Sequence, residues 1–303
     1  YPAEKNGKLD NNIVKKLKKE FSAEESPNGN IALGYGCVSS HRRGDWCLTV
    51  KGHSRYLWGA EHYDGANKYG RYLGFGAMNL MAPRNRESIA AHLSSGWIEE
   101  GFDWGRIPGT TAIHLPIEKL EADIKKVDSF AGVEEMLLSD EYFAGGLSQQ
   151  GDNGNFGMIL HEHDKYDGSH RARKSYHFFD EEVVCLGSNI ENDVKDYSTE
   201  TTIFQLNLEK ESDKQFWAES LNYNYCMDHL GNGYYFPKEM TGKILYDKNL
   251  KQMSLRSTDG QHTEGAWVTL SLNHGNAPKD EDYEYAILPK TEIGKLSELA
   301  LKP

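Results

Sequence analysis

Residues 101–116 read Gly-Phe-Asp-Trp-Gly-Arg-Ile-Pro-Gly-Thr-Thr-Ala-Ile-His-Leu-Pro. The tract places Trp104, Arg106, a Pro-Gly pair and His114 at spacings that a generic β-strand has no reason to show. It therefore marks a defined element of one particular fold, and the surrounding sequence indicates the fold class.

A second distinctive tract, residues 173–190, reads Arg-Lys-Ser-Tyr-His-Phe-Phe-Asp-Glu-Glu-Val-Val-Cys-Leu-Gly-Ser-Asn-Ile. Asp180-Glu181 is a turn signal between two strand-like runs, and Gly231-Asn232-Gly233 is another. Turn residues between apolar runs of this length are typical of β-hairpins. Both tracts predict antiparallel strand pairs.

Alternating side chains extend this pattern over much of the chain. Trp46, Leu48 and Val50 alternate with smaller or polar neighbours, and so do the apolar residues within 267–272 and 283–288. This is the period of a half-buried strand, so we expect the first three to face a core. No internal repeat is apparent. We predict an all-β fold: a large antiparallel multi-sheet β-sandwich with a few short helices.

Helical spacing of apolar residues occurs in residues 11–21, 117–124 and 293–299. We expect residues 1–30 to be a helical lead-in and linker, because Pro, Gly and Asn follow the first helix. Residues 31–290 then form one sandwich domain. Residues 291–303 begin a connection to a further C-terminal domain.

Composition limits the classes of function. Aromatic residues make up 11% of the chain, including 17 Tyr and 6 Trp, which suits a sheet protein and a sugar-binding face. The net charge of −12 argues against nucleic acid as a partner, and a sulfated ligand would need a local basic groove. No apolar run reaches the length of a membrane span. The first residues lack both an initiator Met and signal-peptide character, so we expect a processed chain or an excised piece.

The cysteines are scattered and form no closely spaced pair, so a structural zinc site is disfavoured and free buried thiols are expected; they are Cys37, Cys47, Cys185 and Cys226. The cluster of His161, Glu162, His163 and Asp164, followed by Asp167 and His170, leaves two interpretations open. Imidazoles on one strand face could bind a cation. A solvated, charged strand end is the favoured alternative.

Residues 142–157 are polar and rich in glycine, which indicates a loop whose backbone can approach a ligand closely. The alternative is a long surface hairpin. Residues 41–43, His-Arg-Arg, form a small basic point on an acidic chain that could face an anion, although such a run is more often a solvated turn.

Taken together, residues 101–116 and 173–190 resemble the central β-sandwich of polysaccharide lyase family eight, the chondroitin AC, chondroitin ABC and hyaluronate lyases. The tracts 58–63 and 69–72 resemble it too, and the similarity runs from about residue 34 to 285, closest to the chondroitin ABC type. The resemblance implies a galactose-mutarotase-like super-sandwich between an N-terminal α/α toroid and a smaller C-terminal β domain.

The resemblance also implies a reaction. These lyases cut uronic-acid polysaccharides by β-elimination, with the main catalytic residues on the toroid, while the sandwich lends a Glu and an Asn to the active site. Gln150 and Asn153 are aligned with those two positions here. The departure at Gln150 matters, because an amide can hydrogen-bond but cannot carry charge or take a proton.

The resemblance suggests further substrate contacts. Arg71 could pair with a uronate or sulfate, and the structural alternative is an Arg packed under aromatic rings. Trp104 and Arg106 are candidate substrate-binding residues, as are Asp103 and His114, although family signatures in sandwiches also mark folding constraints.

We therefore expect the central domain of a chondroitin or dermatan sulfate lyase that supplies one wall of the substrate cleft and is inactive by itself. Its partners would be the sulfated glycosaminoglycan, hyaluronan as a further substrate, and other domains of the same chain. The family implies a secreted, periplasmic or cell-surface location, and a divalent cation in the full-length enzyme is left open.

The alternative is a non-catalytic carbohydrate-binding or scaffold module. A glycoside hydrolase or mutarotase would need paired acids such as Glu99, Glu100 and Asp103 in one cleft, and adjacent acids on a strand point apart.

Overall fold

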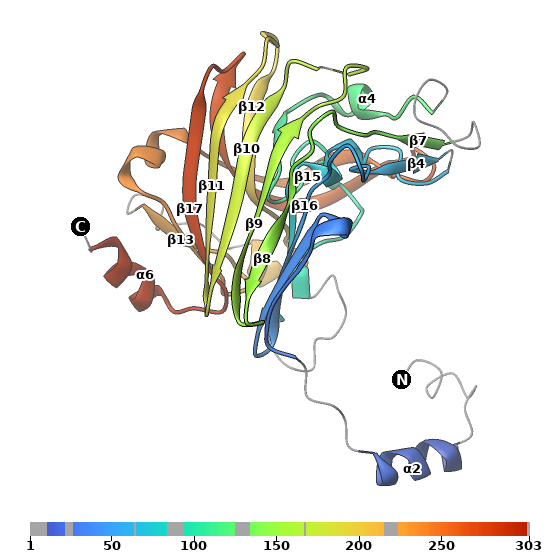
Figure 1. Cartoon of the computed structure of the whole chain (residues 1–303), viewed down its shortest axis with the longest axis vertical. Helices are drawn as coiled ribbons and strands as arrows, with labels where there is room; N and C mark the ends of the chain where they lie inside the picture. Colours follow the sequence, from blue (N-terminus) through green and yellow to red (C-terminus); the bar gives the residue numbers. More distant parts are fainter. Residues whose placement is uncertain are drawn as a thin grey trace.

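The computed structural model describes residues 11–21, 27–63, 65–83, 94–124, 134–166, 168–214 and 224–301 (Figure 1). The body of the chain consists of antiparallel β-sheets with short helices at its edges. This confirms the predicted class, an all-β multi-sheet sandwich. Within the described ranges, no helix is long and apolar enough to cross a membrane.

The largest sheet has seven strands in the order β13-β14-β17-β11-β10-β9-β8, all antiparallel. Its strands are β8 (Ala144–Gln149), β9 (Asn153–His161), β10 (Arg171–Phe179), β11 (Glu182–Glu191), β13 (Tyr225–Met227), β14 (Gly233–Tyr235) and β17 (Glu281–Leu288).

Two four-stranded sheets and a two-stranded ribbon complete the body. The sheet β15-β16-β12-β6 consists of β6 (Thr111–Ile113), β12 (Ser198–Asn207), β15 (Ile244–Leu255) and β16 (His262–Asn276). The sheet β1-β2-β3-β5 consists of β1 (Gly29–Leu33), β2 (Val38–Arg43), β3 (Trp46–Lys51) and β5 (Ala77–Met81). The ribbon pairs β4 (Glu61–Tyr63) with β7 (Glu134–Met136).

The helices are short and peripheral in Figure 1. The α-helices are α2 (Asn11–Glu20), α4 (Ile117–Leu120), α5 (Glu211–Lys214) and α6 (Ile293–Ala300), and the 3-10 turns are η1 (Gly34–Gly36), η2 (Arg71–Gly74) and η4 (Lys238–Lys243). Helices α2, α4 and α6 fall where the apolar spacing predicts them.

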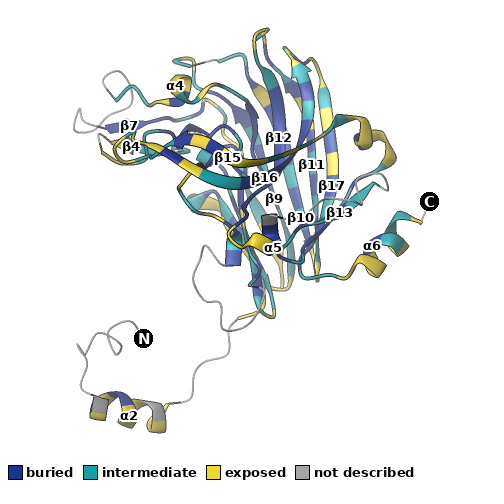
Figure 2. Ribbon diagram, turned by 180° about the vertical axis from the view of Figure 1, so that it is seen from behind, coloured by how far each residue is buried: buried dark blue, intermediate teal, exposed yellow. Residues whose placement is uncertain are grey.

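The predicted core strand is confirmed: Trp46, Leu48 and Val50 of β3 are all buried. Their neighbours on β3 are only partly buried, as the alternation predicts. The same two-residue period buries one face of the seven-stranded sheet, where buried residues follow the central strands (Figure 2). Apolar burial along these strands supplies the main driving force for folding.

The hairpin predicted from residues 173–190 is confirmed as β10 and β11, with Phe179 opposite Glu182 across the turn. Asp180 in that turn has a φ of 38°, in the left-handed region that Asp tolerates better than most residues. The four cysteines are free, and three of them are buried, as expected.

Two expectations need correction, and one open alternative is decided. The first sheet strand starts at Gly29, just before the predicted Ile31. Residues 142–157 are mostly hairpin, because β8 and β9 pair up to Gln149 opposite Asn153 and leave only a short turn. Residues 267–272 of β16 are buried on both faces, because the tract 101–116 covers the polar face, where Gln205 of β12 accepts a hydrogen bond from the Asp103 amide (2.8 Å).

The tract 101–116 lies where the three larger sheets meet. The amide of Met78 in β5 donates to the carbonyl of Pro108 (2.7 Å). The next residue, Gly109, donates its own amide to the carbonyl of Thr202 in β12 (2.7 Å). One turn of this tract therefore supplies backbone partners to two different sheets.

Lys174 of β10 links the third sheet to the same turn. Its side chain is buried, and its ammonium group donates to the carbonyl of Gly109 and to the hydroxyl of Thr111, both at 2.7 Å. The Thr111 hydroxyl is 2.8 Å from the Thr201 hydroxyl, which in turn is 2.8 Å from Nε2 of His274. A chain of polar contacts thus crosses the interior from the seven-stranded sheet to the sheet β15-β16-β12-β6.

Two glycines allow the sheets to come this close. Tyr176 of β10 donates its hydroxyl to the carbonyl of Gly76 (2.9 Å). Gly76 has a φ of 83°, and a Cβ there would lie 2.2 Å from the Tyr176 hydroxyl. Gly109 has a φ of 84°, and its Cβ would lie 2.6 Å from the Gly76 carbonyl oxygen. A larger residue at Gly109 would have to move backbone, and one at Gly76 would displace the buried side chains of Tyr176 and Lys174.

Burial lowers the pKa of Lys174 from 10.5 to about 7. Between these two pH values Lys174 is largely neutral in the folded chain and protonated in the unfolded chain. The unfolded chain therefore binds more protons, and the free energy of unfolding of the domain should rise with pH. Below about pH 7 the group is protonated in both states and contributes no slope. We expect Lys174→Met to remove this rise, as measured by urea denaturation at about pH 7 and about pH 9.

The exposed Lys251 on β15 gives a matched control, because Lys251→Met removes the same group from a solvated site. That variant should retain the pH dependence of the parent chain. An unchanged pH dependence in Lys174→Met would show that the buried ammonium does not titrate as proposed.

Candidate functional site

Gln150 lies at the tip of the β8–β9 hairpin and is exposed. Its φ is 55° and that of Gly151 is 77°, and the Asp152 amide closes the turn by donating to the Gln149 carbonyl (3.0 Å). Successive left-handed residues match the right-handed twist of the paired strands. The turn therefore holds the Gln150 amide at the rim of the seven-stranded sheet, as predicted.

Asn153 lies at the same corner and joins two hairpins. Its side-chain oxygen accepts from Nη2 of Arg43 (2.9 Å) and from the amide of Asp180 (2.8 Å). The Arg43 guanidinium also lies 2.8 Å from Asp152 and 3.7 Å from Asp180. The structure thus brings Gln150 and Asn153 together, with Asn153 already committed to internal contacts.

Arg43 belongs to this corner, although the basic run at 41–43 gave no sign of it. Its carboxylate partners are distant in sequence, so only the pairing of hairpin ends reveals the contact. His41 is buried beside it and contacts the Asp180 carbonyl through Nε2 (2.9 Å). Burial lowers the pKa of His41, so the imidazole stays neutral at neutral pH.

Arg71 takes the structural alternative that the sequence left open. It is 5% exposed, and its guanidinium carbon lies 3.5 Å from the ring centroid of Tyr166. One of its terminal nitrogens donates to the carbonyl of Lys119. A polysaccharide on the surface of this domain would reach little of this side chain.

Trp104 also packs inside. It is 6% exposed, its indole nitrogen donates to the carbonyl of Leu255 (3.2 Å), and its ring meets Phe102 edge to face at 5.1 Å. These contacts fix the tract 101–116 against the sheet formed by β15 and β16. Stacking on a sugar would require the ring to leave the core.

Arg106 is paired with several acids. It forms a bidentate ion pair with Glu200 (2.9 and 3.1 Å), and its Nη1 lies 3.6 Å from Asp247 and 3.9 Å from Asp103. Burial alone would raise the pKa of Glu200, but the hydrogen bonds and charge of Arg106 outweigh it and hold that pKa below its usual value. The guanidinium is therefore already neutralised within the domain.

His114 completes this cluster through Asp103, 2.9 Å from its Nε2. Burial disfavours the imidazolium, yet the contact with Asp103 outweighs burial and raises the pKa of His114. Together, Asp103, Arg106, His114 and Glu200 form a partly buried ionic network that ties the tract 101–116 to β12. Its geometry serves cohesion, because each charge faces an opposite charge inside the domain.

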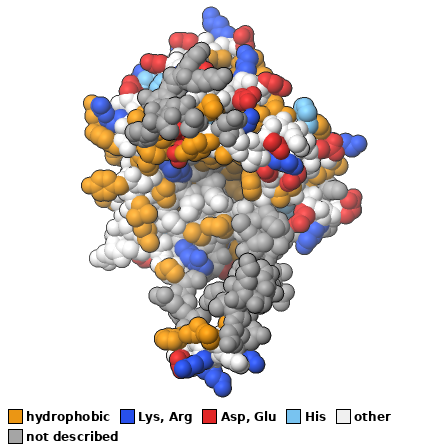
Figure 3. Space-filling model, turned by 90° about the vertical axis from the view of Figure 1, so that its right-hand side faces the viewer, with side chains coloured by type: hydrophobic (Ala, Val, Ile, Leu, Met, Phe, Trp, Pro, Cys, Tyr) orange, Lys and Arg blue, Asp and Glu red, His pale blue; other side chains and the backbone are white. Residues whose placement is uncertain are grey.

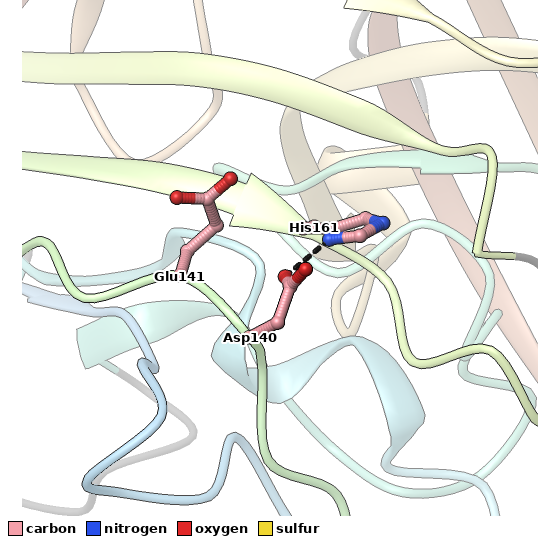
Figure 4. A group of neighbouring side chains, drawn as sticks. All are labelled: Asp140, Glu141 and His161. Carbon is pink, nitrogen blue, oxygen red and sulfur yellow. Dashed lines mark hydrogen bonds and ion pairs between the residues drawn. The ribbon is translucent and has the colours of Figure 1, made fainter.

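The predicted histidine cluster divides on folding. Asp140, Glu141 and His161 have ligand atoms within 4.8 Å of one another, and Figure 4 shows Asp140 pointing to Nδ1 of His161. Nε2 of His161 contacts the Gly168 carbonyl (2.7 Å), so both ring nitrogens already face acceptors. The expected solvated strand end is wrong for most of the cluster, because His161, Glu162 and His170 are buried and only Asp164 is exposed. Asp167 lies outside the described residues.

A cavity of about 610 Å³ lies between the sheets and is lined mainly by apolar side chains, including Leu48, Trp97 and Leu206. Such a lining suits hydrophobic groups and gives few partners to a polyanion.

By contrast, one outer face carries exposed hydrophobic groups among charged ones (Figure 3). On the outside of the domain, Tyr56 and Tyr142 flank Arg55, a contact that the sequence analysis missed because the two tyrosines are far apart in the chain.

Comparison with known proteins matches residues 38–300 to the family model for polysaccharide lyase family 8, super-sandwich domain. The chain is 52% identical over 293 residues to a chondroitin sulfate ABC exolyase of Bacteroides thetaiotaomicron, covering 96% of this chain and 28% of that protein. It is 39% identical over 297 residues to a chondroitin sulfate ABC exolyase of Proteus vulgaris, covering 92% and 29%. The chain thus spans less than a third of the length of these relatives.

Among solved structures, a Streptomyces coelicolor chondroitin AC lyase in complex with chondroitin sulphate matches with a TM-score of 0.75 over 95% of this chain and 37% of that chain. The two sequences are 22% identical, so this likeness shows the fold alone. The resemblance inferred from residues 101–116 and 173–190 is confirmed, since both tracts lie inside the family match. The chain therefore belongs to polysaccharide lyase family 8 and forms its super-sandwich domain.

Proposed function

We propose that this domain belongs to a chondroitin or dermatan sulfate lyase that cleaves its polysaccharide by β-elimination, and that it forms one wall of the substrate cleft. The observation that carries the proposal is the 52% identity, over 96% of the chain, to a chondroitin sulfate ABC exolyase. A domain so similar over its whole length is expected to serve the same kind of enzyme. We propose on the same ground that the parent protein acts outside the cytoplasm, at the cell surface, in the periplasm or secreted.

β-Elimination needs a group that neutralises the uronate carboxylate, a base for the C5 proton and an acid for the leaving oxygen. Gln150 can donate and accept hydrogen bonds but transfers no proton. Arg106 and His114, the other polar candidates, are held by Asp103 and Glu200 within the domain. We therefore assign proton transfer to parts of the parent beyond this chain, and orientation to this domain.

The Gln150 turn is the part of the domain best suited to face the cleft. It is exposed at a sheet rim, and the corner beneath it is fixed by the contacts of Asn153 with Arg43 and Asp180. A rigid corner lets an exposed amide meet a sugar hydroxyl or a catalytic side chain without losing much entropy on binding.

A non-catalytic carbohydrate-binding module is the second candidate. The observation that favours it is the exposed pair of tyrosines around Arg55, which resembles a binding surface more than a reaction centre. The two functions differ in whether the parent protein generates unsaturated product.

We expect the 303-residue chain alone to give no lyase turnover and the full-length parent to be active on chondroitin sulfate. The reason is that the groups proposed here for proton transfer lie outside this domain. Ultraviolet absorbance of the unsaturated product measures both proteins under the same conditions. Turnover by the isolated chain at the parent's rate would overturn this division of labour, and an inactive parent would favour the binding module.

Within the full-length parent, Gln150→Gly should lower kcat/KM by about two- to tenfold, since it removes one side-chain hydrogen bond. Glycine accepts the left-handed φ of 55°, so the turn itself should remain intact. Gln150→Glu should raise kcat/KM by about tenfold or more, because a carboxylate forms stronger, charge-assisted bonds to a cationic catalytic group.

Asp280→Gly is the matched control, because Asp280 also has a left-handed φ (54°) and lies at the start of β17, the opposite end of the sheet. It should leave kcat/KM unchanged. If Gln150→Gly and Gln150→Glu behave like this control, the Gln150 turn has no part in the cleft. Asn153→Ala is less informative, because it also releases Arg43 and Asp180.

A further inference from the structure

Arg55 lies between two exposed tyrosine rings on the outside of the domain. Its guanidinium carbon is 4.5 Å from the ring centroid of Tyr142 and 5.8 Å from that of Tyr56. The two rings are 6.2 Å apart and meet edge to face. Tyr56 is 72% exposed and Tyr142 is 64% exposed, so these three residues, here called the Arg55 patch, present aromatic faces and a cation to solvent.

The backbone beneath the Arg55 patch is well ordered by hydrogen bonds. The amide of Ser54 donates to the carbonyl of Leu57 (3.0 Å), which closes the turn that carries Arg55 and Tyr56. The Arg55 amide donates to the carbonyl of Glu141 (2.8 Å), which fixes this turn beside Tyr142. The backbone that carries the rings is therefore fixed before any ligand arrives, which lowers the entropic cost of binding.

The charge of Arg55 is available to a ligand, unlike those of the three arginines already assigned to internal contacts. Arg43 and Arg106 face carboxylates, and Arg71 is buried under Tyr166. Across the described part of the chain, the Arg55 side chain forms no ion pair, and its guanidinium lies against the two tyrosine rings. A guanidinium that lies over an aromatic ring keeps its N–H donors free, because these point outward in the plane of the guanidinium itself. There they match the oxygens of a carboxylate or sulfate.

The nearby acids do not cancel this cation. Asp140 faces His161, and Figure 4 shows its carboxylate turned toward that imidazole. Glu141 approaches Arg55 through its backbone carbonyl, and no salt bridge joins their side chains. On a chain with a net charge of −12, the exposed guanidinium of Arg55 is a local positive charge set between two aromatic rings.

The surroundings of the Arg55 patch also suit an extended ligand. Phe143 follows Tyr142 and is 56% exposed, and its ring covers Gly157 so closely that a Cβ there would lie 3.3 Å away. Gly145 continues β8 without a side chain. Aromatic side chains beside bare backbone give a flat surface on which a sugar ring can lie.

The Arg55 patch is separate from the Gln150 turn. Tyr142 precedes β8 and Gln150 follows it, and at about 3.3 Å per residue the eight intervening steps span roughly 25 Å. One monosaccharide cannot contact both places. The two sites thus make separate predictions.

We propose that Arg55, Tyr56 and Tyr142 form an accessory binding site for an acidic polysaccharide, with a pyranose ring against the tyrosines and a uronate or sulfate on the guanidinium. The choice of polysaccharide rests on the proposed function, whereas the requirement for an anionic sugar comes from the patch itself. This site holds the chain outside the Gln150 turn and contributes affinity without chemistry.

Binding of size-defined chondroitin sulfate to the 303-residue chain, measured by isothermal titration calorimetry at low salt, tests the proposal. Arg55→Gln and Tyr142→Ala should each weaken binding by about tenfold. Added salt should lower the affinity of the unsubstituted 303-residue chain more than it lowers the affinity of the Arg55→Gln variant. Arg173→Gln is the matched control, because it removes an exposed arginine from β10 and should change the affinity less than about twofold. A neutral dextran should not bind.

The proposal is overturned if the unsubstituted 303-residue chain binds no chondroitin sulfate, if dextran binds equally well, or if Arg173→Gln weakens binding as much as Arg55→Gln does. Circular dichroism of each variant ensures that a loss reflects the patch and not unfolding; if Tyr142→Ala unfolds, Tyr142→Leu replaces it. Lyase activity of the full-length parent is measured separately. An inactive parent with intact, Arg55-dependent binding would reject the proposed function alone, and an active parent without such binding would reject the accessory site alone.

Discussion

The ammonium group of Lys174 reaches from the seven-stranded sheet to the turn at Gly109 and Thr111, and this buried contact sets how the sheets pack. A buried amino group, charged or neutral, is unfavourable unless its N–H donors are satisfied, so the backbone at Gly109 must stay in place. Tyr176 adds a second contact of the same kind, because its hydroxyl donates to the carbonyl of Gly76, the residue just before β5. Since only glycine fits at these two positions, the meeting point of the three sheets has little freedom.

From this junction the rest of the domain follows as hairpins that end at the rim. Arg43 draws Asp152, Asn153 and Asp180 into one corner, and Arg106 joins the tract 101–116 to Glu200. Most arginines named here thus serve cohesion. Arg55 differs because it lies between exposed tyrosines, so it offers an anionic sugar both a cation and aromatic faces.

The sequence predicted the fold better than the site. Two-residue alternation identified β3 and β17, and turn residues identified the hairpin of β10 and β11, because both signals are local. The polar tract 142–157 left a loop and a hairpin open, since glycines that permit close packing in a strand look the same as glycines of a loop, and the structure shows the hairpin. Arg71 and Trp104 were candidates for binding because a sequence does not show whether a charged or aromatic side chain is buried.

The sequence by itself determined the class of fold, the family and the position of Gln150 at one rim of the sandwich, because the hydrophobic period, the turn residues and the distinctive tracts are local features of the chain. Only the tertiary structure decided which groups meet across it. Arg106 with Glu200, Asn153 with Arg43, and Tyr56 with Tyr142 are each separated by about ninety residues or more. Their contacts depend on how three sheets pack around Gly109, and no local pattern encodes that geometry.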